Sequence, residues 1–257
     1  MKIATWNVNS VRARLPRLLA WLEERRPDVV CLQELKCLDE QFPREPLEDL
    51  GYNVETYGQK TYNGVAILAK KRLEDVVRGF PEDPAPAQHR VLGATVGDFL
   101  LLCVYVVNGQ EVGSEAYELK RLWMERLAAH VKAHYDMAEK VIVAGDFNIT
   151  FDDRDVYNPE EWREQILCTS AEREWLAHLI EPGLHDALRK FTQEGGIYTW
   201  WDYRTGAFRR NHGLRLDHFL MSRPALAACT VVEVDVEARR GEKASDHAPV
   251  VATFESP

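Results

Sequence analysis

The chain has 257 residues, of which 46% are hydrophobic and 28% charged, and its formal net charge is −9 at pH 7. This length suits one large sandwich or barrel as well as two small domains, and the apolar share is sufficient for a sizeable core. No apolar run approaches the roughly 18 residues of a membrane helix, and MKIATWNVNS lacks the features of a signal peptide, so we expect a cytoplasmic protein without a membrane span.

Short apolar runs rich in β-branched residues predict about ten strands. In chain order, the predicted strands are residues 2–6, 29–32, 64–69, 91–96, 99–107, 141–144, 197–201, 216–221, 230–236 and 250–254. The Pro-rich segment 81–87 has the composition of a loop within a domain rather than of a linker between domains. The five cysteines are odd in number and lie mostly within apolar runs, which predicts reduced core thiols rather than disulfides or a zinc site.

Helical patterns lie between some of these strands. Leucines in 15–22 follow helical spacing, with Pro16 in the first turn, and a second apolar stripe covers 119–131. A third helix is expected to start at Thr169, because Thr169 and Glu172 have the spacing of a capping box. Alternating strands and helices predict a single α/β (α+β) domain over residues 1–257, with two packed sheets and outer helices.

The sharpest polar cluster follows the predicted strand at 141–144, in the sequence VIVAGDFN. Side chains two residues apart on an extended segment share a face, so Asp146 and Asn148 project together. A carboxylate can take a proton from water, and a neighbouring amide can orient that water. The alternative interpretation is a strand-terminal turn, which Gly, Asp and Asn all favour.

Three other strand boundaries carry oxygen-rich residues: Asn7, Glu34 and Asp246. Together with Asp146 they supply the hard oxygen ligands that Mg²⁺ prefers. Taken singly, Glu34 could be a surface residue and Asn7 a turn residue. Their recurrence at strand ends predicts one magnesium site at the mouth of the sandwich.

Two further candidates come from apolar runs. Asp217 lies within a predicted strand, where an unpaired carboxylate would be costly, and His247 is a natural partner for it. A purely structural ion pair is the alternative. Tyr105, close to Asn108, could donate a hydrogen bond to a phosphate or simply pack in the core.

Basic residues are unevenly distributed despite the net negative charge. The stretches 1–22 and 203–216 contain arginines and no acid, so they could line a phosphate track or be ordinary solvated loops. The aromatic run 198–201 precedes the second stretch, and aromatics beside arginines can hold an unpaired sugar or base. Core packing is the alternative for each tryptophan of that run.

The motifs KIATWNVNS, DVVCLQELK, TYNGVAIL, CVYVVNG, VAGDFN, YTWWDYR, GLRLDHFL and SDHAPV, in this order, resemble the exonuclease III family of the endonuclease/exonuclease/phosphatase superfamily. The resemblance runs from Lys2 to Phe254. It implies a four-layered αββα sandwich of two mixed, mainly antiparallel sheets. It also implies a Mg²⁺-dependent DNA repair nuclease, with Mn²⁺ able to substitute, acting as a monomer on duplex DNA with abasic sites or 3′ ends.

The resemblance assigns roles to the candidate residues. The catalytic group would be Tyr105, Asp146, Asn148, Asp217 and His247. The metal group would be Asn7, Glu34, Asp146, Asn148 and Asp246. The acid-free basic stretches, the aromatic run and the polar residue near Tyr105, rather than the resemblance, supply the predicted DNA-binding group: Arg12, Asn108, Trp200, Arg204, Arg209, Arg210 and Arg215.

Two positions depart from the family pattern: Val107 stands where proline is common, and Asn9 where some members carry aspartate. They leave open how activity divides between abasic-site cleavage, 3′-end trimming and 3′-phosphate removal. The main alternative is a phosphodiesterase of the same fold acting on a lipid or an inositol phosphate, and the aromatic run beside arginines favours DNA over it. An inactive binding module would be expected to have lost ligand positions that are intact here.

Overall fold

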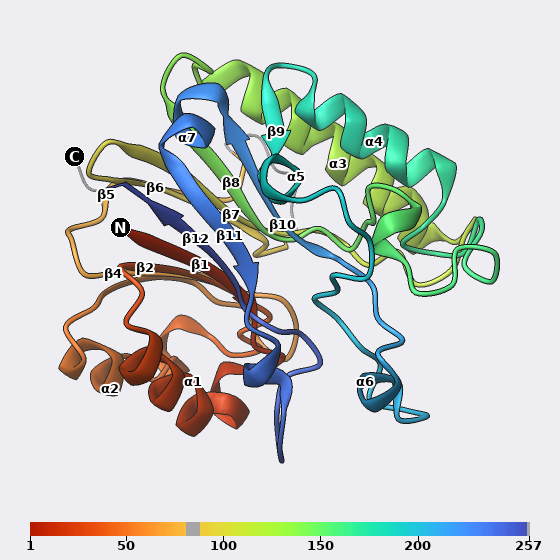
Figure 1. The fold of residues 1–257 in the computed structure, drawn as a ribbon. Coiled ribbons are helices and arrows are strands. Elements are labelled where there is room, and N and C mark those ends of the chain that lie inside the picture. Colours follow the sequence, from red (N-terminus) through yellow and green to blue (C-terminus); the bar gives the residue numbers. More distant parts are fainter. Residues whose placement is uncertain (81–87, 256–257) are drawn as a thin grey trace.

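The computed structural model describes residues 1–80 and 88–255, so the predicted loop at 81–87 lies outside the described part. Two six-stranded sheets pack face to face (Figure 1). The first sheet has the order β11(Cys229–Val234), β12(Val250–Phe254), β1(Lys2–Asn7), β2(Val29–Gln33), β4(Val65–Ala69), β3(Asn53–Tyr57). The second has the order β5(Glu74–Arg78), β6(Val91–Val96), β7(Phe99–Tyr105), β8(Lys140–Asp146), β10(Asp217–Ser222), β9(Leu184–Asp186).

Helices cover both outer faces, as Figure 1 shows for α1 and α2 on one side and α3 and α4 on the other. The α-helices are α1(Val11–Arg25), α2(Arg44–Asp49), α3(Glu115–His134), α4(Ser170–Ile180), α5(Leu188–Phe191), α6(Ala207–Arg210) and α7(Arg223–Ala228). Short 3₁₀ helices are η1(Asp39–Gln41), η2(Asp153–Asp155) and η3(Val236–Arg239). The four-layered αββα sandwich is therefore confirmed.

The side chains of β2 show why both faces of each sheet are covered. Cys31 points into the core between the sheets, whereas Val30 and Leu32 point into the core beneath α1. All five residues of the strand are buried. Because alternate side chains of a strand face opposite ways, a continuous apolar run requires an apolar layer on each side.

The helix start predicted from the capping box at Thr169 and Glu172 is confirmed. The Thr169 hydroxyl accepts from the Glu172 N–H at the start of α4, and the Glu172 carboxylate accepts from the Thr169 N–H. The stripe predicted on α3 is only partly correct, because Leu119 and Leu122 are 37% and 38% exposed. The buried face of α3 instead carries Lys120, Trp123, Met124, Leu127, His130 and Val131.

The predicted strand at 197–201 is wrong. This segment makes isolated bridges, Trp200 to Leu214 and Trp200 to His247, instead of a ladder. It crosses the mouth of the sandwich, where its backbone bonds to two different segments: Thr199 N–H donates to Leu214 O, and Trp201 N–H donates to Asp246 O. The prediction failed because an apolar run can be buried by crossing strand ends as well as by joining a sheet.

All five cysteines are buried and free, as predicted. Within residues 1–80 and 88–255, no helix is long and apolar enough to cross a membrane.

Candidate active site

The predicted strand ends converge because of the way the strands pair. β1 runs parallel to β2 and β7 runs parallel to β8, so their carboxyl ends share an edge of each sheet. In the second sheet, Asp146 lies opposite both Tyr105 on β7 and Asp217 on β10. In the first sheet, Asn7 is opposite Gln33, which precedes Glu34.

Asn7 joins the two sheets through one amide group. Its Nδ2 donates to Glu34 Oε1 at 2.9 Å and to Asp146 Oδ2 at 2.9 Å. Its Oδ1 accepts from the backbone N–H of Asn9 at 2.9 Å. Asn7 therefore holds two carboxylates from different sheets side by side.

Asp217 and His247 form the predicted pair: Nδ1 of the ring lies 2.8 Å from Asp217 Oδ2, and both side chains are buried. On the other side of the ring, Nε2 lies 3.7 Å from Asp146 Oδ2. Burial opposes a charged ring, but the carboxylates of Asp217 and Asp146 outweigh it and raise the pKa of His247 to about 10. The Thr199 hydroxyl accepts a hydrogen bond from the Asp217 N–H at 3.0 Å, which holds the backbone of Asp217 in place.

Asp146 has the electrostatic environment of a general base. Burial, reinforced by the Asp217 carboxylate and opposed by His247, raises its pKa to about 7. A carboxyl group with a pKa near the working pH is best suited to exchange a proton with water. Its backbone position depends on Gly145, where a Cβ would lie 1.8 Å from the carbonyl oxygen of Val104.

Asn148 is held tightly beside Asp146. Its N–H donates to Asp146 Oδ1 at 2.9 Å, and its Nδ2 donates to Val106 O at 3.0 Å. Its φ of 50° lies in the left-handed region, a strained conformation for a residue other than glycine. The amide of Asn108 donates to Asn148 Oδ1 at 3.1 Å, which ties the exposed Asn108 to the site.

Sequence reasoning missed Lys120, which supports Asn148 from behind. Its ammonium group is fully buried and donates to the backbone carbonyls of Asn148, at 2.7 Å, and of Asn108, at 3.1 Å. It also forms an ion pair with Glu172, the residue of the α4 capping box. The signal was its position three residues before the buried Trp123 on the same helical face.

Lys36 was also missed, although it follows Glu34 by two residues. Its ammonium pairs with Glu34 Oε2 at 2.8 Å and donates to Asn9 Oδ1 at 2.6 Å. Burial would raise the pKa of Glu34, but Lys36 and the Asn7 amide outweigh burial and lower it. Asn9, one of the two departures from the family pattern, in turn donates to Asp246 Oδ1 at 3.0 Å.

Asp246 lies at the edge of this network, where Trp200 Nε1 donates to its Oδ2 at 3.0 Å. Tyr105 is buried with the guanidinium of Arg90 4.5 Å from its ring centre. Burial, with the nearby Glu34 carboxylate, raises the pKa of Tyr105 well above its ordinary value, so the phenol keeps its proton and can donate a hydrogen bond.

The residues fit a hard divalent cation. Among the described residues, Asp146, Asp217 and His247 form a group whose ligand atoms lie within 4.8 Å of one another. Because Asp217 and His247 are already bonded to each other, we favour the carboxylate of Glu34, which Asn7 holds beside Asp146, as the primary donor. Carboxylate and amide oxygens are what magnesium binds, with water and substrate oxygens completing its shell.

Most predicted DNA-contacting residues are at the surface. Arg12 is exposed at the start of α1, Arg209 and Arg210 are exposed on α6, and Arg204 is exposed with a pairing to Asp202. Exposure is compatible with the prediction and leaves it a prediction.

The prediction for Arg215 is wrong, because this residue cannot reach DNA. Its side chain is 2% exposed and forms ion pairs with Asp155 at 2.7 Å and Asp186 at 2.6 Å. The planar guanidinium fork satisfies two buried carboxylates at once, which makes Arg215 a core residue.

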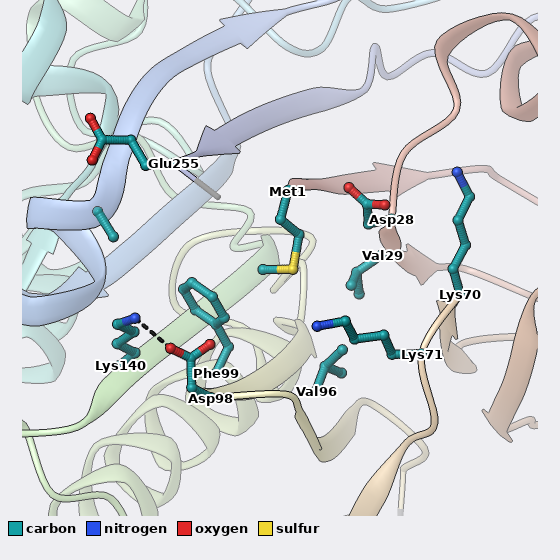
Figure 2. Close-up of a pocket in the computed structure, with 11 residues that line it drawn as sticks. Met1, Asp28, Val29, Lys70, Lys71, Val96, Asp98, Phe99, Lys140 and Glu255 are labelled. Carbon is teal, nitrogen blue, oxygen red and sulfur yellow. Dashed lines mark hydrogen bonds and ion pairs between the residues drawn. The ribbon is translucent and has the colours of Figure 1, made fainter. Parts of the chain in front are cut away.

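A cavity of about 440 Å³ lies at the opposite end of the sandwich (Figure 2). Met1, Val29 and Phe99 give it an apolar wall, and the Lys71 ammonium points toward its centre. None of the candidate active-site residues lines it. The chemistry therefore belongs to the other end, where the polar strand ends meet.

Comparison with known proteins agrees with this arrangement. Residues 4–247 match the Endonuclease/Exonuclease/phosphatase family. Exodeoxyribonuclease III of Haemophilus influenzae is 37% identical over 99% of this chain and 100% of its own length. The solved 3′ phosphatase NExo from Neisseria, bound to a product DNA hairpin, is 44% identical with a TM-score of 0.96 and full coverage of both chains.

An AP endonuclease from Archaeoglobus fulgidus is 35% identical, also with a TM-score of 0.96 and full coverage of both chains. Nucleases of the exonuclease III type are metal-dependent, consistent with the carboxylates gathered here. The similarity to these relatives covers the whole chain, and the two packed sheets with polar residues at their strand ends are consistent with the same family. The chain belongs to the exonuclease III and AP endonuclease family, and it is a DNA repair nuclease.

Proposed function

We propose that the chain is a Mg²⁺-dependent nuclease whose main activity is processing 3′ ends of duplex DNA, by removing terminal nucleotides or 3′ phosphates. The observation that carries the proposal is the meeting of Asp146 with Glu34 and with the Asp217–His247 pair at one end of the sandwich. The 44% identity with a Neisseria protein described as a 3′ phosphatase and as a 3′-5′ exonuclease supports 3′ ends as the main substrate. Cleavage beside abasic sites is the second activity, supported by the 35% identity with an AP endonuclease.

Glu34 would hold the Mg²⁺ ion, with Asp146, Asp246, Asn7 and Asn148 around it. When bound, the ion supplies neutralisation of the negative charge that builds up on the phosphate and the leaving oxygen. Mn²⁺, which accepts the same oxygen donors, is expected to substitute.

The chain's own residues supply the proton transfers and the positioning. Asp146 takes a proton from water as the water oxygen bonds to phosphorus and the bond from phosphorus to the departing 3′ oxygen breaks. Asn148, fixed in its left-handed conformation, orients that water. His247, kept protonated by Asp217, and the phenol of Tyr105 donate to phosphate oxygens and stabilise the transition state. The departing 3′ oxygen takes a proton from solvent water, so the products carry a 3′ hydroxyl and either a 5′ phosphate or free phosphate.

The exposed arginines at positions 12, 204, 209 and 210 would neutralise phosphates flanking the site, and Trp200 and Asn108 would contact the nucleotide next to it. The proposal takes the enzyme to be a monomer. We place that enzyme in the cytoplasm, acting on duplex DNA.

The experiment is a side-by-side assay on three duplexes: a recessed 3′ end, a 3′-phosphate end and an internal abasic site. We expect cleavage of all three in Mg²⁺, fastest on the 3′ ends, and none in EDTA. The matched pair Asp146→Asn and Asp98→Asn separates chemistry from folding, because Asp98 is an exposed carboxylate at the far end of the sandwich that pairs only with Lys140 among the described residues. Release of phosphate from a lipid or inositol phosphate with intact duplexes would overturn the proposal.

A further inference from the structure

A second hollow, of about 650 Å³, lies behind the segment that crosses the mouth of the sandwich. Its wall includes the aromatic side chains of Tyr198, Trp201 and Phe208, and two arginines, Arg209 and Arg240, also line it. Its size is within the range of small-molecule sites, which are mostly apolar with a few polar groups. We call it the aromatic pocket.

The aromatic pocket and the active site share one wall. Trp200 turns its indole N–H to Asp246 in the site, whereas its neighbour Trp201 lines the pocket. The Trp201 backbone N–H donates to the backbone oxygen of Asp246 at 3.0 Å. Trp201 therefore connects the pocket, which it lines, to the active site. A DNA strand that leaves the site on this side would meet the pocket next.

The pocket wall is rigid. Phe208 packs edge-on against Trp201 at 5.1 Å, and the Trp201 indole N–H donates to Asn211 Oδ1 at 3.1 Å. The Arg239 guanidinium lies 4.9 Å from the Phe208 ring centre and 5.1 Å from that of Tyr203. These contacts hold the rings in place before any ligand arrives, which lowers the entropy cost of binding.

The two lining arginines differ in their availability. Arg240 pairs with Glu237 at 2.8 Å, whereas Arg209 is exposed and has no ion pair among the described residues. A free guanidinium at the edge of an aromatic wall suits a ligand that has a flat apolar body and a phosphate. A nucleotide has both, and stacking on aromatic side chains next to cationic groups is how unpaired strands are bound.

We propose that the aromatic pocket binds an unpaired nucleotide of a single strand that extends beyond the duplex end held in the active site. The base packs against Phe208, the least buried of the three rings, and the exposed Arg209 pairs with its phosphate. This inference rests on the proposed function, because it assumes a duplex end in the site. It adds a preference for ends that carry a single-stranded extension, which follows from neither the active site nor the family match.

The test measures binding of the full chain in EDTA, so that no DNA is cut. The probes are a blunt DNA hairpin and the same hairpin with a five-nucleotide 5′ or 3′ extension containing 2-aminopurine. We expect one extended hairpin to bind roughly fivefold or more tightly than the blunt one, the equivalent of one stacked base. The extension of that hairpin should also show quenched 2-aminopurine fluorescence. Which extension binds identifies the strand that the pocket takes.

Variants assign the preference to the pocket. Phe208→Ala and Arg209→Ala should each bring the affinity ratio of extended to blunt hairpin close to one. Arg210→Ala is the matched control, because Arg210 is the next exposed arginine on α6 and does not line the pocket; it should keep the ratio. Phe208→Leu, which keeps apolar volume without a ring, replaces Phe208→Ala if that variant does not fold.

Equal affinity for blunt and extended hairpins, or the same loss of preference in Arg210→Ala and Arg209→Ala, would overturn the inference. Tight competition by free thymidine monophosphate with no extension preference would show a mononucleotide site and would also overturn it. Failure of the proposed function looks different, since the chain would then leave all three duplexes uncut in Mg²⁺ whatever its hairpin preference.

Discussion

Replacing Asp217 by asparagine should lower the pKa of His247, to which we assign a hydrogen bond to the substrate phosphate. Asp217→Asn keeps the size of the side chain and removes its negative charge, which lies 2.8 Å from His247 Nδ1. The pKa of His247 is about 10, against 6.5 for an ordinary histidine. That difference corresponds to roughly 5 kcal/mol at 1.36 kcal/mol per pKa unit. Two unit charges at this distance give roughly 6 kcal/mol at an effective dielectric constant of 20, so one carboxylate can account for most of it.

In the variant, His247 should therefore be neutral at pH 7.5, and turnover should fall roughly 10²–10³-fold because a charged hydrogen-bond donor to the phosphate is lost. Two measurements check this: the NMR titration of the His247 ring, and single-turnover cleavage of a recessed 3′ end. The effect on stability has a definite sign. A histidine with a raised pKa stabilises the fold fully below pH 6.5 and loses that contribution as the pH rises through about 10. The stability difference between variant and parent should shrink over that range.

The control is Asp98→Asn, the same substitution at the opposite end of the sandwich, which should leave both measurements unchanged. The double variant Asp217→Asn/His247→Asn should be little worse than the worse single variant, because both changes disable one unit. A His247 ring that titrates identically in Asp217→Asn and the parent, or losses that add, would refute the reasoning.

Four other outcomes are expected. Glu34→Gln should raise the Mg²⁺ concentration needed for half-maximal cleavage severalfold or more, and an unchanged requirement would remove Glu34 from the metal site. Asp146→Asn should lower turnover by several orders of magnitude while DNA affinity in EDTA stays largely intact; the reverse pattern would make Asp146 a binding residue. Arg209→Ala with Arg210→Ala should reduce the slope of log affinity against log salt on a duplex by roughly 1.8, with little change in turnover at saturating DNA, whereas the parent slope would mean a solvated loop. Burial, reinforced by a nearby arginine, lowers the pKa of His218 to about 4, so stability should decline by up to roughly 3 kcal/mol as pH falls from 6.5 through 4. Urea unfolding at several pH values should show a weaker acid dependence in His218→Gln, and an unchanged dependence would contradict this origin.

The sequence was sufficient to predict which polar residues come together, because these residues directly follow or precede apolar runs. A buried strand must end where its apolar run ends. Polar residues at that point cannot enter the core, so they lie at the mouth of the sandwich. Asn7, Glu34, Asp146 and Asp246 were all found in this way. Their meeting was predictable, whereas the bonds among them, such as the Asn7 amide between two carboxylates, depend on the side-by-side placement of the two sheets.

Arg215 shows why charge along the chain is a poor guide to charge in space. The stretch around it has no acid, which suggested a free cation. Its partners are Asp155 and Asp186, which lie 60 and 29 residues away in the sequence. Lys120 was missed for a related reason: a lysine on a helix is normally solvated, and only a buried carboxylate from another helix, Glu172, allows it inside.

The pairing of β1 with β12 has a consequence for synthesis of the chain. Strand β12 fills the place beside β1, and the turn before it delivers Asp246 and His247 to a site whose first member is Asn7. The ribosome must therefore translate residues 246–254 before β1, which already pairs with β2, acquires its second neighbour and before His247 can join Asp217. Nascent chains and prematurely terminated products carry the carboxylates of Glu34 and Asp146 without the residues that complete them. The order of the elements therefore leaves this group of polar residues incomplete until residue 247 has been translated.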